Sequence, residues 1–343
     1  MSGLACAWFL KQKNKNNRVV IYEASSILGG RTYSYLNKNL GLKLDNAVHA
    51  VVGANKFMSR FIKKDEWLKN KYFIDMQTDT LDNSIIHNSD HILKSFCNTK
   101  ASDIDNRIRN NILKTLFPFT RAKTKVWFSK QDLTPRIINM LAAYADEIKL
   151  NSRLQRISSQ FGMAAMLDFG SYSVDIGAND KVIIALDNLA CNKILNVNRL
   201  EHSSIINITF KTSQTIFLPK GTSFIGVKNG IADWIFVDNN LLTVVISDAD
   251  IKDNKLSDVA IKVWKELDAI RGVNSGFLPP YKATIFPNAT IKQDIKNNAL
   301  RPQKPLTEYP NVYIAGDWTM RDYPCCMETA IKSAERAVRF AQR

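Results

Sequence analysis

Long apolar runs, cysteine pairs and sequence repeats are all missing from this chain of 343 residues. No stretch of about eighteen or more apolar residues occurs, so no transmembrane helix is expected. The first residues lack a basic segment followed by an apolar run and a small-residue cleavage site, so we expect no secretory signal. The five cysteines are odd in number and show no paired metal-ligand spacing, which favours a reducing cytoplasm over a disulfide framework. They are Cys6, Cys97, Cys191, Cys325 and Cys326.

Acidic residues are outnumbered by basic ones, and the net charge is +15. Three interpretations are open: a diffuse compositional bias, attraction to an anionic membrane surface, and nucleic-acid binding. Lysine and asparagine are abundant throughout, and no basic helix interleaved with aromatic residues or nucleic-acid motif is present. We therefore expect no nucleic-acid partner. The membrane interpretation would bring a cytoplasmic protein to the inner face of the membrane.

The remaining composition is that of a globular protein, with 45% hydrophobic and 23% charged residues. Apolar periodicity and turn residues predict a mixture of helices and strands, with buried parallel-type strands near both ends, which indicates an α/β fold. Helices are expected over 3–11, 55–64, 91–97, 104–116, 131–145, 248–270 and 327–343. Strands are expected over 18–23, 147–150, 154–158, 172–176, 181–185, 205–210, 234–237, 241–247 and 311–315.

Gly3 and Glu23 have the spacing of a dinucleotide-binding unit. Gly3 opens an apolar helix, and Glu23 ends the strand that follows it. In such units a helix N-terminus faces the pyrophosphate, and an acidic residue about twenty positions on binds the ribose hydroxyls. The strand before Gly3 and the first two glycines of the usual fingerprint are absent, and Glu23 could equally be an exposed residue at a strand end.

A glycine pair and an arginine, Gly29, Gly30 and Arg31, follow directly after Glu23. Paired glycines permit a tight turn against a ligand, and a guanidinium suits phosphate. Here the chain resembles FAD-dependent amine oxidases and carotenoid or phytoene desaturases, in which a Gly-Gly-Arg follows the ribose-binding glutamate. The resemblance implies that these three residues border the FAD pyrophosphate; the alternative is a plain surface turn.

The C-terminal part completes the resemblance. The segment Val-Tyr-Ile-Ala-Gly-Asp-Trp-Thr at 312–319 resembles the closing strand of the family and its Gly-Asp motif, which implies that Gly316 and Asp317 bind FAD. The stretch Pro-Cys-Cys-Met-Glu-Thr-Ala at 324–330 resembles a Pro-x-x-Met-Glu-Gly-Ala motif. That likeness implies that the helix starting near Met327 and Glu328 points amide donors at the flavin. Thr329 replaces the usual glycine.

The segment Leu-Asp-Asn-Ala-Val-His-Ala-Val-Val-Gly-Ala at 44–54 is similar to squalene-associated FAD-dependent desaturases, also called hydroxysqualene dehydroxylases. Pro287-Asn288-Ala289-Thr290 and Arg301-Pro302 add to this likeness, which is thin over about 65–125. His49 in this segment is a candidate acid or hydrogen-bond donor near the flavin; the alternative is a histidine that is partly buried and simply hydrogen-bonded.

Other candidate sites are weaker. His87 and His91 have a helical metal-ligand spacing without a third ligand, so no metal site is expected. Cys325 and Cys326 are adjacent, which disfavours a disulfide, and we interpret them as small residues beside the flavin. The aromatic pair Trp127-Phe128 and the segment Phe117-Pro118-Phe119 are interpreted as core.

The resemblance implies a Rossmann-like FAD-binding domain of the GR2 type that lacks its first strand, plus an α+β substrate domain with an antiparallel sheet. We expect the FAD domain to combine 1–60, 146–203 and 305–343, and the substrate domain to combine 61–145 and 204–304. The expected function is flavin redox chemistry on an apolar isoprenoid, as in hydroxysqualene dehydroxylase. Alternatives are a carotenoid desaturase, an amine oxidase, a degenerate non-catalytic remnant, or a truncated gene model.

Overall fold

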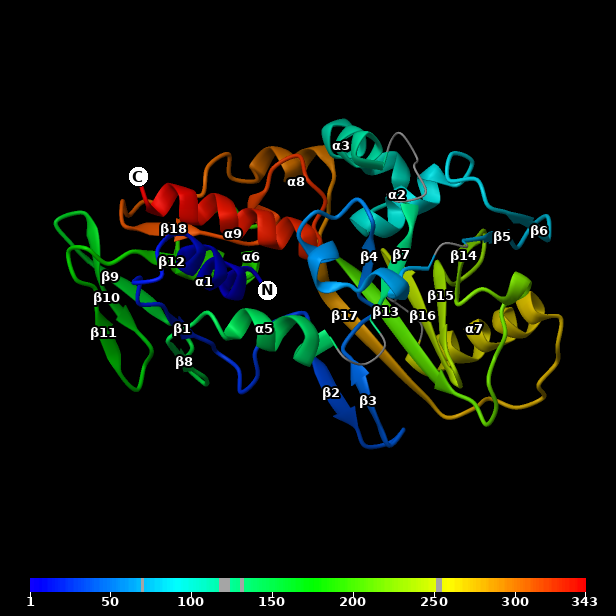
Figure 1. Ribbon diagram of the computed structural model, residues 1–343. Coiled ribbons are helices and arrows are strands. Elements are labelled where there is room, and N and C mark those ends of the chain that lie inside the picture. The colour runs from blue at the N-terminus through cyan, green and yellow to red at the C-terminus, as the bar shows by residue number, and fades with distance from the viewer. Residues whose placement is uncertain (69–70, 117–123, 130–132, 251–254) are drawn as a thin grey trace.

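A seven-stranded sheet forms the larger β structure of the protein (Figure 1), which we describe from a computed structural model over residues 1–68, 71–116, 124–129, 133–250 and 255–343. Its strand order is β17-β13-β16-β15-β14-β5-β6, and every pair is antiparallel except β14 with β5. The strands are β17 (Tyr281–Ile291), β13 (His202–Lys211), β16 (Leu241–Ser247), β15 (Trp234–Asp238), β14 (Phe224–Lys228), β5 (Phe73–Asp75) and β6 (Thr80–Asp82). The antiparallel sheet expected from the sequence is confirmed, although the sequence did not predict β5, β6, β14 or β17.

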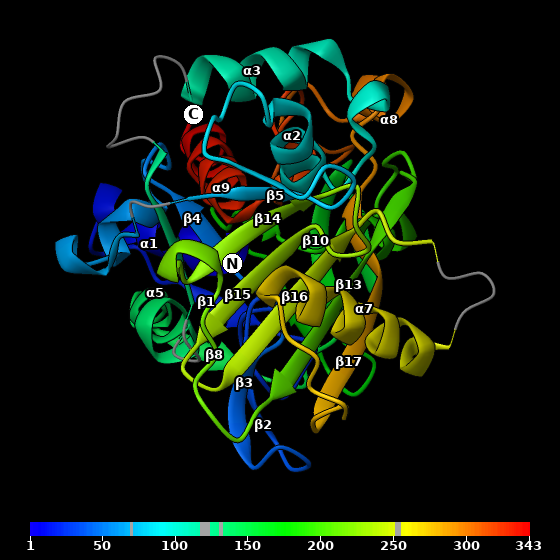
Figure 2. The same cartoon turned by 90° about the vertical axis from the view of Figure 1, so that its right-hand side faces the viewer.

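One face of this sheet is apolar because side chains alternate along each strand. Ile206, Ile208 and Phe210 of β13 belong to a buried core cluster with Trp264 and Leu267 of α7 (Leu256–Arg271). Figure 2 shows α7 lying across this face of the sheet. Asn207 and Thr209, which alternate with these residues along β13, point to the opposite face of the sheet, away from α7.

The other half of the protein contains two short parallel strand pairs (Figure 1). β1 (Val20–Tyr22) pairs with β8 (Glu147–Lys149), and β12 (Val182–Ile184) pairs with β18 (Val312–Ile314). In the part of the chain that the structure describes, no strand joins one pair to the other. A three-stranded antiparallel unit of β9 (Arg156–Gln160), β10 (Met163–Asp168) and β11 (Ser173–Asp175) completes the strands of this half. The arrangement agrees with a Rossmann-like fold without its first strand.

Helix α1 (Ser2–Lys13) packs against α9 (Met327–Ala341), so the first and last helices of the chain lie side by side. A Cβ atom on Gly3 would lie 3.3 Å from the Cβ of Ala185, just beyond β12. This contact is tight, and a side chain at position 3 would press the helix away from the strand.

Shorter elements connect the two halves. They are β2 (Ser34–Asn37), β3 (Leu42–Asp45), β4 (Ala50–Val52), β7 (Val126–Phe128), α2 (Ser89–Cys97), α3 (Asn106–Leu116), α5 (Asn139–Ala142), α6 (Asn188–Ile194) and α8 (Ile295–Leu300). Trp127 and Phe128 are each 4% exposed, as expected for core residues. Residues 117–119 lie outside the described residues, so the interpretation of the aromatic segment there stays a prediction, as does the division into two domains.

The predicted helix over 55–64 is wrong. Two 3-10 turns, Met58–Phe61 and Lys64–Glu66, occupy this region. The backbone amides of Lys56, Phe57 and Met58 donate to the carboxylate of Glu328, a contact made in tertiary structure that local periodicity does not reveal. None of the described helices is long and apolar enough to cross a membrane.

Replacing Ile208 by alanine should lower the free energy of unfolding by about 2–5 kcal/mol, because a fully buried side chain between β13 and α7 would leave a cavity. The matched control is Ile261→Ala on the exposed side of α7, which should change it by about 0.5 kcal/mol or less. Urea unfolding followed by circular dichroism measures both, and equal effects of the two substitutions would contradict this packing.

Candidate functional site

An ion pair joins the two ends of the predicted cofactor site. The Nη2 group of Arg31 donates to Oδ1 and Oδ2 of Asp317 at 2.8 and 2.9 Å. Asp317 is 6% exposed, and its charge is the main reason that the pKa of Arg31 is raised. Arg31 also donates to the carbonyl of Ala289. The structure therefore brings together the Gly-Gly-Arg and Gly-Asp motifs, which are 286 residues apart.

The glycine turn before Arg31 is built on left-handed backbone. Gly29 and Gly30 have φ of +115° and +63°, and a Cβ on Gly29 would lie 2.1 Å from the carbonyl oxygen of Thr32. The carbonyl of Gly29 accepts from the amide and the hydroxyl of Thr32 at 3.1 and 2.8 Å. The amino group of Met1 also donates to it at 3.4 Å, so the start of α1 faces this turn.

Glu23 lies directly after β1. Its carboxylate accepts from the amide and hydroxyl of Ser25, both at 2.9 Å. Burial lowers the pKa of the Met1 amino group to about 6, helped by Arg31 and opposed by Glu23 and Asp317. These charged groups therefore act on one another at the N-terminal end of α1, the place where a helix attracts an anion.

Gly316 begins the loop that carries Asp317. Its φ is +156°, and a Cβ there would lie 2.7 Å from Nε1 of Trp318. Its amide donates to the hydroxyl of Ser333 on α9 at 2.9 Å, which fixes the loop against the helix. Gly316 is therefore required for local packing, and its contact with a cofactor stays a prediction.

Met327 and Glu328 form the first turn of α9. Met327 packs at the border of the apolar cluster around α1 and α9. The Glu328 carboxylate is 5% exposed and accepts from the amides of Lys56, Phe57 and Met58 at 2.8–3.2 Å. Glu328 thus ties the helix start to the segment after β4, and a cofactor contact of either residue stays a prediction.

Arg301 is a functional candidate that sequence reasoning missed, although Arg301-Pro302 contributed to the resemblance. Its side chain is 2% exposed and donates to three carbonyls of the loop that follows Gly316. Nη2 bonds Asp317 at 2.8 Å, Nε bonds Trp318 at 3.0 Å, and Nη1 bonds Tyr323 at 2.8 Å. A guanidinium is suited to this task because its donors point in fixed directions. Arg301 is a positioning residue for Asp317.

These residues fit the FAD that the resemblance implies. Arg31 and the start of α1 supply positive charge and donors for a diphosphate, and the Glu23 carboxylate is an acceptor for ribose hydroxyls. Gly30 meets no atom within 4 Å of a built Cβ, so the backbone there is open to a ligand. Glu23, Gly29, Gly30, Arg31, Gly316 and Asp317 would hold the cofactor.

His49 is a neutral imidazole. Burial, with a contribution from Arg31, lowers the pKa of His49 to about 4. Its Nε2 lies 3.1 Å from Oδ1 of Asn46, so Nε2 carries the proton in this contact. The Asn46 side chain also donates to the carbonyl of Arg31 at 2.8 Å and accepts from the amide of Tyr33 at 3.1 Å. His49 has the partner expected of a structural histidine, and its catalytic role stays a prediction.

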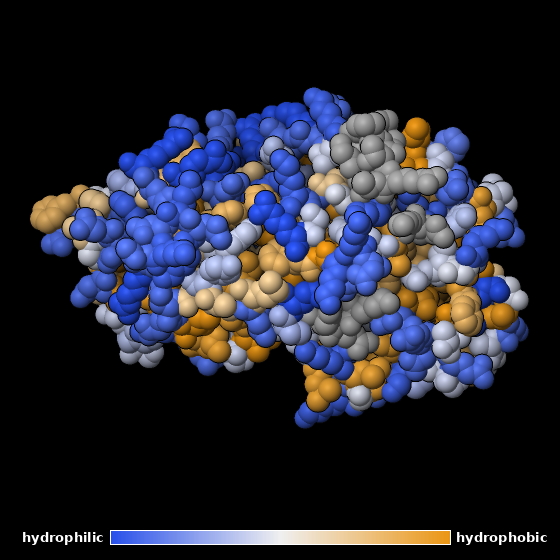
Figure 3. All heavy atoms as spheres, viewed as in Figure 1, coloured by the Kyte–Doolittle hydropathy of each residue, from blue (hydrophilic) through white to orange (hydrophobic). Residues whose placement is uncertain are grey.

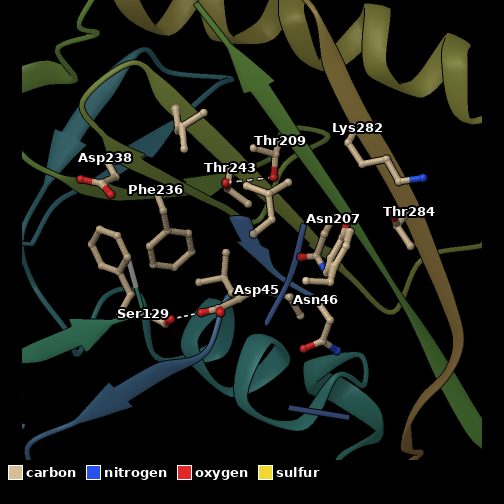
Figure 4. Close-up of a pocket in the computed structure, with 16 residues that line it drawn as sticks. Asp45, Asn46, Ser129, Asn207, Thr209, Phe236, Asp238, Thr243, Lys282 and Thr284 are labelled. Atoms are coloured by element: carbon tan, nitrogen blue, oxygen red, sulfur yellow. Dashed lines mark hydrogen bonds between the residues drawn. The ribbon is translucent and has the colours of Figure 1, made fainter. Parts of the chain in front are cut away.

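A pocket lies on the other side of Asn46, between the large sheet and the segment from β3 to β4 (Figure 4). One wall is formed by residues on β13, β15, β16 and β17, and the other by residues on β2, β3, β7 and the segment after β3. Asp45 accepts from the Ser129 hydroxyl at the base of the pocket. Because Asn46 contacts both this pocket and Arg31, the pocket adjoins the cofactor residues.

The remaining candidates are not assembled into sites by the described residues. His87 pairs with Asp82 at 3.3 Å. Across 1–68, 71–116, 124–129, 133–250 and 255–343, no three His, Cys, Asp or Glu side chains are arranged to hold a metal. The five cysteines are free thiols. Burial raises the pKa of Cys325 to about 12, which makes its thiol a poor nucleophile.

Replacing Arg301 by methionine should lower the free energy of unfolding by about 3 kcal/mol or more, because three loop carbonyls lose a charged donor. Arg301→Lys should recover only part of the loss, since an ammonium cannot reach all three carbonyls in the same geometry. The control is Arg156→Met, whose side chain is 70% exposed and should change stability by less than about 1 kcal/mol. Urea unfolding at pH 7.5 gives the values, and an Arg301→Met protein as stable as the control would refute the positioning role.

The depressed pKa of His49 predicts a pH dependence of stability. The unfolded chain takes up a proton near the ordinary value of 6.5, whereas the folded chain resists it down to about 4. The contribution of His49 is therefore complete above pH 6.5 and is lost as the pH falls toward 4, by at most about 3 kcal/mol. The free energies of unfolding of wild type and His49→Gln, measured between pH 7.5 and 4.5, should converge at low pH. Parallel curves would show that His49 does not cause the pH dependence of stability.

Two family models match the chain. Residues 1–64 match an NAD(P)-binding Rossmann-like domain, and residues 136–340 match the flavin containing amine oxidoreductase family. The hydroxysqualene dehydroxylase of Zymomonas mobilis is 24% identical over 410 aligned residues, covering 99% of this chain and 97% of that protein. The hydroxysqualene dehydroxylase of Sinorhizobium fredii is 28% identical over 208 residues, covering 60% of this chain. That alignment spans about half, 48%, of the relative's length.

Solved structures agree on the fold. An oxidoreductase from Methanosarcina mazei is 13% identical, with a TM-score of 0.72 over 97% of this chain and 96% of that one. Cyclohexylamine oxidase from Brevibacterium oxydans is 10% identical, with a TM-score of 0.70 over 99% of this chain and 96% of that one. The family model at 136–340 covers more than half of the 343 residues. The chain belongs to the flavin containing amine oxidoreductase family, a family of FAD-dependent oxidoreductases.

Proposed function

We propose that this protein is an FAD-dependent oxidoreductase acting on an apolar isoprenoid, with an activity like that of hydroxysqualene dehydroxylase. The contact between Arg31 and Asp317 carries the cofactor half of the proposal, because it unites both FAD motifs at one ion pair. The substrate half is supported by the alignment with the Zymomonas mobilis protein along almost the whole chain.

FAD, when bound, would supply the chemistry of hydride transfer to or from a substrate carbon. The chain's own residues would bind and orient it. Glu23 would accept from the ribose, and Gly29, Gly30 and Arg31 would border the diphosphate next to Asp317. Arg301 would keep the loop of Asp317 in place through its three carbonyl contacts. His49, neutral at pH 7, would act as a hydrogen-bond group beside the reacting atoms rather than as a charged acid.

The part of the substrate that carries its polar group would enter the pocket that adjoins Asn46, because the cavity volume of about 60 Å³ is too small for a whole isoprenoid chain. Its lining includes six apolar residues that can contact an isoprenoid chain. They are Leu44, Ala47, Val48, Phe128, Phe236 and Leu241. A dehydroxylase would release hydroxide from the substrate and place hydride on the same allylic system. A carotenoid desaturase or an amine oxidase would share the cofactor residues. The three activities would therefore be distinguished only by the substrate that the protein converts.

Association with the inner face of a membrane is a further part of the proposal, since such substrates dissolve in lipid. Aromatic side chains of α1 and the turn after β4, Trp8, Phe9, Phe57 and Phe61, form one half-buried cluster. Arg60 lies 6.0 Å from the Trp8 ring and 5.3 Å from the Phe57 ring. Aromatic rings beside a cation suit a lipid headgroup region. The face in Figure 3 is mainly hydrophilic, with apolar residues exposed in smaller patches.

The deciding experiment reconstitutes the full chain with FAD and incubates it with hydroxysqualene and a reductant under anaerobic conditions. We expect squalene as the product and a flavin absorption spectrum that persists after gel filtration. Glu23→Gln should weaken FAD binding about tenfold, because a charged acceptor for ribose hydroxyls is lost. Glu201→Gln, at an exposed ion pair with Lys296, is the matched control and should bind FAD like wild type.

Two outcomes of this experiment would contradict the proposal in different ways. A protein that retains no flavin would favour the non-catalytic alternative. A flavoprotein that leaves hydroxysqualene unchanged but oxidises an amine or desaturates a carotenoid precursor would support one of the other family activities.

A further inference from the structure

The pocket beside Asn46 contains one buried group without a hydrogen-bond partner. Asn207 on β13 is 6% exposed, and neither Oδ1 nor Nδ2 of its side chain has a partner among the described residues. A buried carboxamide normally bonds through both atoms, because leaving them unpaired is costly. Asn207 therefore calls for an explanation that the fold does not provide.

The alternation of β13 directs Asn207 into the pocket. Ile206 and Ile208, on either side of it, belong to the core against α7. Its cross-strand neighbours are Thr284 on β17 and Val245 on β16. In the next row of the same face, Thr209 lies between Lys282 and Thr243. The pocket face of the sheet is thus largely polar, opposite a face that is apolar.

Several other polar side chains that line the pocket are bonded to one another or to nearby residues. The hydroxyls of Thr209 and Thr243 lie 3.1 Å apart and bond each other. Asp45 accepts from Ser34 and Ser129, and Asn46 bonds Arg31, Tyr33 and His49. Figure 4 shows the ammonium end of Lys282 pointing away from Asn207 and Asn46. Asn207 is the pocket residue whose buried donor and acceptor are free within the described chain.

We propose that Asn207 recognises the hydroxyl of an isoprenoid alcohol and so determines which substrates the pocket accepts. This inference rests on the proposed function and specifies its substrate class. A carboxamide offers N–H donors on Nδ2 and an acceptor on Oδ1, and a hydroxyl offers the complementary acceptor and donor. The carbons next to the hydroxyl would lie against the apolar pocket residues named above, and the rest of the chain would lie outside this pocket.

Charge in the pocket disfavours an anionic headgroup. Asp45 and Asp238 line it, so a carboxylate ligand would meet like charges. An ammonium ion would donate to Oδ1 of Asn207 but has no acceptor for Nδ2, so one buried atom would stay unpaired. A hydrocarbon would leave both atoms unpaired. An alcohol satisfies the site better than any of these three.

The test compares hydroxysqualene with squalene, which differ by the hydroxyl group. Dissociation constants are measured in detergent micelles with the FAD-reconstituted full chain, using tryptophan fluorescence. We expect wild type to bind the alcohol about tenfold more tightly than the hydrocarbon, the effect of about one hydrogen bond. In Asn207→Leu this preference should fall to about one, with the hydrocarbon bound at least as tightly as before.

Stability gives a second readout of the same substitution. Asn207→Leu removes an unpaired buried carboxamide, so its midpoint of thermal unfolding should rise while alcohol recognition is lost. The matched control is Asn240→Leu, whose carboxamide already donates to the carbonyl of Thr212 at 3.0 Å outside the pocket. Asn240→Leu should lower the midpoint of thermal unfolding and keep the tenfold preference for the alcohol over the hydrocarbon. If Asn207→Leu does not fold, Asn207→Thr, which suits a strand, should still reduce the preference at least threefold.

The outcomes separate this inference from the proposed function. Turnover of hydroxysqualene with an undiminished preference in Asn207→Leu overturns the role of Asn207 and leaves the activity intact. A preference lost in Asn207→Leu without turnover supports recognition and contradicts the activity. Equal affinity of wild type for hydroxysqualene and squalene overturns the inference. It is also overturned if Asn207→Leu weakens the binding of an amine of the same chain length more than the binding of the alcohol.

Discussion

The ion pair between Arg31 and Asp317 is the contact on which the nucleotide-binding half depends. It connects a turn near one end of the chain to a loop near the other, and Asp317 is almost completely buried. Removing Arg31 would leave the buried Asp317 carboxylate without its charged partner, which is more costly than losing a surface salt bridge. Arg301 supports the same loop from behind by binding its carbonyls. The position of the buried carboxylate is therefore determined by two guanidinium groups with different tasks.

A continuous series of hydrogen bonds leads from this ion pair to the pocket. The carbonyl of Arg31 accepts from Asn46, which also contacts His49 and lines the pocket. Asn46 thus keeps the glycine turn and the pocket wall in a fixed relation. The neutral state of His49 follows from this setting, because burial and the nearby guanidinium both disfavour a second positive charge. Cofactor residues and pocket residues therefore form one electrostatic unit.

The sequence predicted that the Gly-Gly-Arg and Gly-Asp motifs meet, and the Arg31–Asp317 contact agrees, whereas their binding of FAD stays a prediction. Glu23 follows the partly buried β1, Gly316 and Asp317 follow the buried β18, and ligands bind outside the carboxyl ends of parallel strands. The roles of Arg301, Glu328 and Asn207 were not predictable, since each depends on contacts with residues far away in the chain. The prediction of a helix over 55–64 was wrong for the same reason, because backbone amides of this segment donate to the distant Glu328 carboxylate. The tight Gly29 turn was predictable because only glycine tolerates its backbone.

Strand β13 divides the substrate half into two environments. Its even-numbered residues Ile206 and Ile208 bury apolar surface against α7 and stabilise the sheet, whereas Asn207 and Thr209 face the pocket. A strand selected only for stability would place apolar residues at buried positions on both faces. Thr209 satisfies its hydroxyl with Thr243, but the Asn207 carboxamide has no such partner in the described chain. A buried unpaired amide that destabilises the free protein can be retained when a ligand completes its hydrogen bonds, which is the reason to seek the substrate's polar group at this position.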